Sequence, residues 1–234
     1  MEKYGYSSDF DSLFEKSEFI KLYPFVGRNY QNMSTKIMVL GESHYIDPEL
    51  DISNYSEAQL KELDDDKYYS RSVLMDDYFA NIREDGTNPN KWIQCYRNTA
   101  AMITGMEYHD SDYVWNNLSF YNFFQSSIGH GAGSQKFITP ELIEDSRKAY
   151  FEVITILKPD FIIAWGLGKL YYKWVPEDGY IEMGEYTYKY KEFPNTLIWH
   201  IKHPSRSFSY EKYHDSFMKK VNELGLDISD VVKQ

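Results

Sequence analysis

Four short runs of apolar residues recur along the chain, each bounded by glycine, proline or polar residues. They lie at 36–40, 118–124, 161–165 and 196–201. Their apolar residues are continuous rather than alternating, which is typical of strands that are buried on both faces of a sheet. The pattern therefore predicts four core strands.

Helical patterns lie between and after these runs. They cover 90–104, 140–157 and 210–224. The middle segment has the strongest signals, because Thr139 can cap its first turn and the acidic residues Glu141 and Glu144 suit its positive end. Residues 180–190 alternate around a glycine and predict a hairpin.

Strands that alternate with helices predict an α/β fold. We expect a three-layer α/β/α arrangement around a central, mostly parallel sheet, in one domain spanning 1–234. The acidic, polar stretch around 47–90 is interpreted as a loop and helix excursion from that sheet. In such folds ligands bind beyond the carboxyl ends of the strands.

Composition narrows the classes of function. The 234 residues carry a formal charge of −11, which argues against a protein that holds nucleic acid by bulk electrostatics. The acidity is uneven, because residues 1–66 hold 14 acidic and 6 basic side chains whereas 158–220 hold 8 and 10. DNA affinity, if present, is therefore expected to be local and salt-sensitive around Lys202 and Arg206.

Compartment and cofactors follow from what the chain lacks. The single cysteine, Cys95, cannot form an internal disulfide or supply a multi-cysteine zinc or iron–sulfur site. No secretory signal or membrane-length apolar run is present, so we expect a soluble, cytoplasmic protein without a cofactor. The 22 tyrosines are consistent either with core packing or with a groove that stacks flat ligands.

Polar motifs follow three of the predicted strands. Gly41-Glu-Ser-His-Tyr45 follows the first, Asn122 lies at the end of the second, and His203-Pro-Ser-Arg-Ser-Phe208 follows the last. In this order they resemble the motifs of the uracil-DNA glycosylase superfamily. The segment 158–166 is also similar to that family's third core strand and the turn after it, so the resemblance covers roughly residues 36–215.

The resemblance implies a uracil-DNA glycosylase-like fold and a monofunctional DNA glycosylase. Such an enzyme flips a pyrimidine nucleotide out of DNA and hydrolyses its N-glycosidic bond, leaving an abasic site. The bond cleavage builds positive charge on the sugar and negative charge on the departing base. Glu42 is the candidate that activates water and offsets the sugar charge, and His203 is the candidate donor to the base. The bland alternatives are a solvent-facing glutamate and a loop histidine bonded to backbone.

Further residues have substrate-binding roles by the same resemblance. Asn122 would read the pyrimidine edge, although it could instead tie two backbone segments together. In the first motif, Gly41 and Ser43 lie beside Tyr45, whose ring would close the pocket next to the pyrimidine C5. In the last motif, Ser205 would bind phosphate, Arg206 would add positive charge, and Phe208 is the candidate wedge.

Two departures from the family pattern leave the substrate open. Ser43 stands where several branches have Asp or Asn, so water activation passes to Glu42 or to Asp47. His44 replaces the family's proline, and the loop after Asp47 is expanded. The base could be uracil or a bulky 5-hydroxymethylcytosine derivative of phage DNA, which would mean repair or antiviral defence respectively.

Other functions have weaker sequence support. His200 and His203 are three residues apart but lack a third metal ligand at motif spacing. A nucleophilic Ser43 would need a small residue where Tyr45 stands. A catalytically inactive nucleic-acid or nucleotide-binding module is the alternative from another class. We expect a monomer that binds DNA and has no membrane, metal or iron–sulfur partner.

Overall fold

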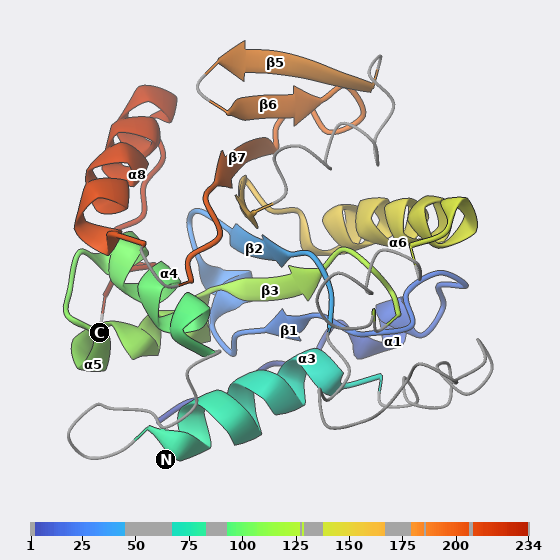
Figure 1. Ribbon diagram of the computed structural model, residues 1–234, viewed down its shortest axis with the longest axis horizontal. Helices are drawn as coiled ribbons and strands as arrows, with labels where there is room; N and C mark the ends of the chain where they lie inside the picture. Colours follow the sequence, from blue (N-terminus) through green and yellow to red (C-terminus); the bar gives the residue numbers. More distant parts are fainter. Residues whose placement is uncertain are drawn as a thin grey trace.

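The computed structural model describes residues 3–44, 67–82, 93–126, 128, 138–166, 179–184, 186–205 and 208–233. Within these ranges the chain forms one seven-stranded sheet in the order β1-β3-β2-β4-β7-β6-β5 (Figure 1). The strands are β1 (Phe25–Val26), β2 (Ile37–Gly41), β3 (Ser119–Asn122), β4 (Phe161–Trp165), β5 (Tyr180–Gly184), β6 (Thr187–Tyr190) and β7 (Leu197–Ile201).

The four central strands, β3, β2, β4 and β7, are parallel to one another. They correspond to the four predicted core strands, and every residue of β2, β3 and β4 is buried. The three outer pairs are antiparallel: β1 pairs with β3, β6 pairs with β7, and β5 pairs with β6. The predicted hairpin is therefore confirmed, and the sheet is mixed with a parallel centre.

The longer helices agree with the periodicity of the sequence. α6 (Pro140–Leu157) and α8 (Tyr210–Leu224) have the predicted bounds, and α4 (Gln94–Thr104) begins after the predicted start. The shorter helical segments are α1 (Asp11–Phe14), η1 (Tyr30–Asn32), α3 (Tyr69–Ser72), η3 (Val73–Tyr78), η4 (Phe79–Asn81), α5 (Tyr108–Ser111) and η6 (Asp112–Asn117).

Helices cover both faces of the sheet, which gives three layers. Ile37, Val39 and Ile163 pack on the face covered by α4 and α8, whereas Met38 and Leu40 pack on the face covered by α6. Figure 1 shows α4 and α8 on one side of the strands and α6 on the other. Alternate residues of each strand thus enter opposite cores, and this explains the continuous apolar runs. The α/β prediction is confirmed at this level.

β1 was not predicted, and the helical segment 69–81 was predicted only as part of a loop and helix excursion around 47–90. β1 is only two residues long, and the helical segment contains a π-helical stretch, η3, that has no simple periodic signature. Arg71 joins these parts, because its buried guanidinium binds the Asp11 carboxylate and the Pro24 carbonyl oxygen. Tertiary contacts rather than local pattern therefore define this margin of the molecule.

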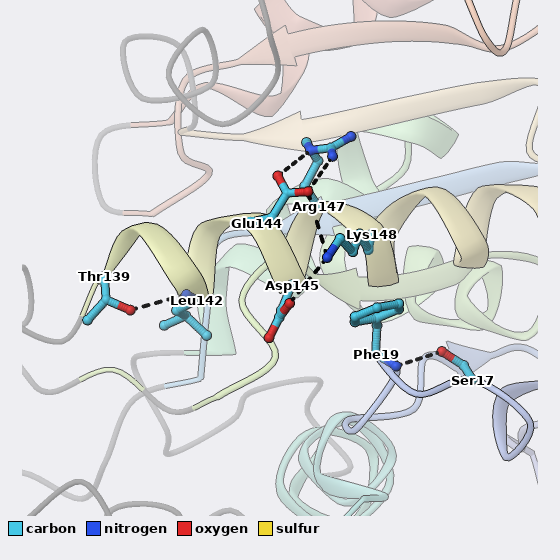
Figure 2. Close-up of polar contacts among 8 residues, drawn as sticks. All are labelled: Ser17, Phe19, Thr139, Leu142, Glu144, Asp145, Arg147 and Lys148. Atoms are coloured by element: carbon cyan, nitrogen blue, oxygen red, sulfur yellow. Dashed lines mark hydrogen bonds and ion pairs between the residues drawn. The ribbon is translucent and has the colours of Figure 1, made fainter.

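α6 shows how local signals define a helix end. The Thr139 hydroxyl accepts a hydrogen bond from the Leu142 N–H at 3.1 Å, as predicted (Figure 2). Further along, the Arg147 guanidinium donates to both Glu144 carboxylate oxygens, at 3.0 and 2.7 Å. The cap satisfies an amide that has no partner within the helix, whereas the exposed ion pair contributes little.

We expect Thr139→Ala to lower the free energy of unfolding by about 1 kcal/mol, because the Leu142 amide loses its acceptor. Thr139→Ser keeps the hydroxyl and is the matched control. Urea unfolding followed by circular dichroism measures both. Equal stabilities for the alanine and serine variants would contradict this account of the helix start.

Candidate functional site

The carboxyl ends of the four parallel strands meet at one edge of the sheet. Gly41 pairs with Asn122, and Trp165 pairs with Ile201. The Gly166 N–H donates to the Ile201 carbonyl oxygen at 3.0 Å, so β4 and β7 remain joined as they leave the sheet. The structure therefore brings the segments after β2, β3 and β7 to a common edge, as the sequence predicted.

The order of the strands makes this edge a topological switch point. The connection after β2 runs to β3 on one side, whereas the connection after β4 runs to the side that holds β7, β6 and β5, so the two connections leave these neighbouring strands in opposite directions. Parallel sheets bind ligands in the crevice where the strand order reverses in this way. Glu42 directly follows β2, and Gly166 directly follows β4. The candidate site is therefore centred on the ends of these two strands.

Gly41 is required by the position of Asn122. A Cβ atom at residue 41 would lie 2.1 Å from Asn122 Oδ1 and 3.2 Å from Phe120 Cζ. Only glycine leaves room for the amide at this point. The Asn122 side chain consequently lies over the end of β2, and it is 5% exposed.

Asn122 contacts a residue that the sequence did not assign to the site. Its Nδ2 lies 3.1 Å from His44 Nδ1, and Ser70 Oγ lies 3.3 Å from His44 Nε2. The same Nδ2 lies 3.3 Å from His44 Nε2. An amide nitrogen can only donate, so at least one nitrogen of the ring accepts. This chain needs a neutral imidazole, and burial lowers the His44 pKa from 6.5 to about 3.

This arrangement gives Asn122 a structural role, because it joins the end of β3 to the segment after β2. That is the alternative that the sequence left open beside base recognition, which stays a prediction. The Tyr69 ring stands edge-on to His44 with 4.5 Å between centroids. The start of the 69–81 helical segment therefore packs against the site.

Backbone hydrogen bonds hold the Glu42 segment in place. The carbonyl oxygens of Gly41, Glu42 and His44 accept from the N–H groups of Phe123, Phe124 and Ile128 respectively, at 2.9–3.0 Å. Glu42 is half-buried, so part of its surface is open to solvent. Its position is set by backbone geometry rather than by a flexible loop.

Ser43 has no activating base among the residues that the structure describes. The residue is buried, and its Oγ has no hydrogen-bond partner among the described residues. A nucleophilic serine needs a general base within hydrogen-bond reach. The described part of the site therefore does not favour Ser43 as a nucleophile.

His203 lies in an exposed loop beside the end of β4. Its ring stands 5.9 Å from that of Trp165, and a Cβ at Gly166 would lie 3.1 Å from His203 Cβ. Gly166 has φ of +64°, a conformation that favours glycine. Desolvation lowers the His203 pKa below 6.5, so the imidazole is neutral at pH 7. The position supplies a neutral donor next to the switch point.

Asn98 of α4 holds the His203 loop, and it is a second residue that the sequence analysis missed. Its Nδ2 donates to the Pro204 carbonyl oxygen at 2.8 Å, and its Oδ1 accepts from the Tyr108 hydroxyl at 2.8 Å. Asn98 is 3% exposed. A buried polar residue within an apolar helix pattern was the available signal, because such a side chain needs partners.

The remaining site residues have different outcomes. Ser205 is exposed, and its N–H donates to the His203 carbonyl oxygen at 2.8 Å, so it stays available at the edge. Phe208 requires a correction, because its ring is 9% exposed and stacks on Tyr213 at 4.3 Å. A ring packed in the core is not presented as a wedge. Three further residues, Tyr45, Asp47 and Arg206, lie outside the described residues.

Within the described ranges, no group of three or more His, Cys, Asp or Glu side chains could hold a metal ion. His200 is half-buried on β7, and burial lowers its pKa to about 4. In the same part of the chain, no helix is long and apolar enough to cross a bilayer.

The buried His44 makes stability depend on pH. The folded imidazole stays neutral down to about pH 3, whereas an unfolded histidine binds a proton near pH 6.5. The unfolded state therefore holds more protons between these values, and the free energy of unfolding falls as the pH is lowered. At pH 5 the loss from this residue is about 2 kcal/mol relative to pH 7.5.

We expect His44→Gln to be less stable at pH 7.5 but to lose less stability between pH 7.5 and 5 than the wild type. His214→Gln is the control, because it removes a histidine from another part of the protein and leaves the buried His44 ring in place. Urea unfolding at the two pH values measures the difference. An unchanged acid slope in His44→Gln would contradict the buried neutral imidazole.

Comparisons with known proteins do not assign this chain to a family. No protein-family model matches it, and no curated protein matches it in sequence.

Proposed function

We propose that the protein is a monofunctional DNA glycosylase, which flips a pyrimidine nucleotide out of DNA and hydrolyses its N-glycosidic bond. One observation carries the proposal. Glu42 and the neutral His203 follow strands on either side of β4, at a switch point where a parallel sheet binds ligands. A carboxylate and a neutral donor are the two groups that this reaction needs on opposite sides of the bond.

The chemistry divides between the two residues. As the bond to the base lengthens, positive charge develops on the sugar, and the Glu42 carboxylate offsets it and orients the attacking water. Negative charge develops on the base, and the His203 imidazole donates a hydrogen bond to the base carbonyl oxygen. A neutral imidazole suffices if that bond tightens only in the transition state.

The loop geometry supports the role of His203. Asn98 fixes the Pro204 carbonyl oxygen from α4, and Gly166 allows the start of the loop to approach β4 closely. A donor that is already held in place costs little reorganisation during the reaction. Asn98 thus acts as a positioning residue, which serves the reaction through the loop that carries His203.

The remaining substrate contacts are part of the proposal. Ser205 and nearby amides bind the phosphate beside the flipped nucleotide, with Arg206 adding positive charge. Tyr45 closes the pocket near the pyrimidine C5, and Asp47 is the alternative residue for water activation. The base is uracil or a modified pyrimidine, and the protein acts as a monomer in the cytoplasm. The uracil-DNA glycosylase resemblance of the motifs supports this class of substrate.

Base release tests the proposal directly. The protein is incubated with duplexes that carry uracil, 5-hydroxymethylcytosine or its glucosylated form, and released base and alkali-labile sites are measured. We expect release from one of these duplexes. Glu42→Gln and His203→Asn should each lower the rate by about 100-fold or more, because each removes a group that acts in the transition state.

Two variants outside the proposed catalytic residues serve as controls. Glu223→Gln changes an exposed carboxylate at the far end of α8, and His214→Asn changes a half-buried histidine that contacts the Met102 carbonyl oxygen. Both should release base at the wild-type rate. Full activity in the Glu42→Gln, His203→Asn double variant would refute the assignment, and DNA binding without released base would indicate the inactive binding module.

A further inference from the structure

The β5–β6 hairpin places its turn at the same edge of the sheet as the candidate site. Thr187, the first residue of β6, pairs with Trp199 in the antiparallel register of β6 and β7. The turn before Thr187 therefore lies toward the carboxyl end of β7, from which the His203 loop departs. The hairpin continues the sheet beyond β7 (Figure 1).

Tyr186 in this turn has an unusual combination of properties. Its side chain is the most exposed among the large hydrophobic residues of the described chain, at 75%. Its φ of +59° lies in the left-handed region, which disfavours a residue with a Cβ. Glycine or asparagine is the usual choice at such a position. A tyrosine there gains no burial to offset the backbone strain.

The position of Tyr186 is nevertheless well defined. The His200 N–H donates to the Tyr186 carbonyl oxygen at 2.9 Å, and the two rings lie edge to face with centroids 6.4 Å apart. His200 precedes His203 by three residues. The turn precedes β6 and the proposed catalytic loop follows β7. Because neighbouring strands are about 4.8 Å apart, the turn and the loop leave the sheet side by side.

We propose that Tyr186 is a DNA-binding residue that stacks on a base next to the flipped nucleotide, where the flip has removed that base's stacking partner. The inference rests on the proposed function for the identity of the ligand. An exposed ring on a held backbone is a stacking platform, and every base offers a flat face to it. The exposed Lys202 follows β7 at the same edge and suits the phosphate backbone.

In this role Tyr186 replaces Phe208, which the sequence analysis named as the candidate wedge. Flipping a nucleotide leaves its neighbours without a stacking partner, and an aromatic side chain can take that place. Phe208 is packed against Tyr213, whereas Tyr186 presents its ring to solvent. A backbone conformation that is unfavourable for tyrosine fits a residue kept for its side chain rather than for the fold.

The test separates binding from folding. Tyr186→Gly relieves the positive φ, so the melting temperature should stay the same or rise. Its affinity for a duplex that carries an abasic-site analogue beside 2-aminopurine should nevertheless fall by about tenfold, with loss of the fluorescence quenching caused by stacking. Tyr186→Phe should keep the wild-type affinity and the fluorescence quenching. Tyr6→Ala, which changes another exposed tyrosine at the β1 margin of the sheet, should bind as the wild type.

Each contrary result has a distinct meaning. Wild-type affinity and quenching in Tyr186→Gly would overturn the inference, and so would a loss of affinity matched by a lower melting temperature. Loss of self-association in sedimentation, with DNA affinity unchanged, would assign the turn to a contact between copies and also overturn it. Because the abasic duplex cannot be cleaved at a base, Tyr186-dependent binding without base release from any substrate would refute only the proposed function.

Discussion

The parallel pairing of β3, β2, β4 and β7 is the constraint on which the rest of the structure depends. Parallel strands cannot be joined by tight turns, so the chain must cross from one end of the sheet to the other between them. α6 makes such a crossing between β3 and β4. The crossings cover both faces with apolar helices, and they leave every carboxyl end at the same edge.

Neutral, buried polar groups hold the candidate site in place at that edge. Asn122 occupies the space that Gly41 leaves, and its amide is satisfied by a His44 ring that burial keeps uncharged. Asn98 of α4 holds the His203 loop in a similar way. In a dry environment an unpaired polar group is costly, so these contacts define one arrangement.

The parts that could be predicted from the sequence are those with strong local signals. The bounds of α6 and α8 follow from periodicity and capping, and the central strands follow from continuous apolar runs. The convergence of Glu42, Asn122 and His203 follows from fold class alone. The burial of Phe208 and the contact between Asn122 and His44 could not be predicted, because both depend on partners distant in the chain.

The pattern of apolar and polar residues was enough to predict the layers, the order of the polar motifs and the α/β class, since these depend on which residues avoid water and at what period. Which side chains are free to act depends instead on contacts between distant parts of the chain. The strand register pairs Asn122 with Gly41. Phe208 is packed against Tyr213 of α8. The antiparallel pairing of β6 and β7 places Tyr186 at the carboxyl edge of the sheet. The physical reason is that strand neighbours are chosen by the joint packing of both cores, and no local stretch of sequence encodes that choice.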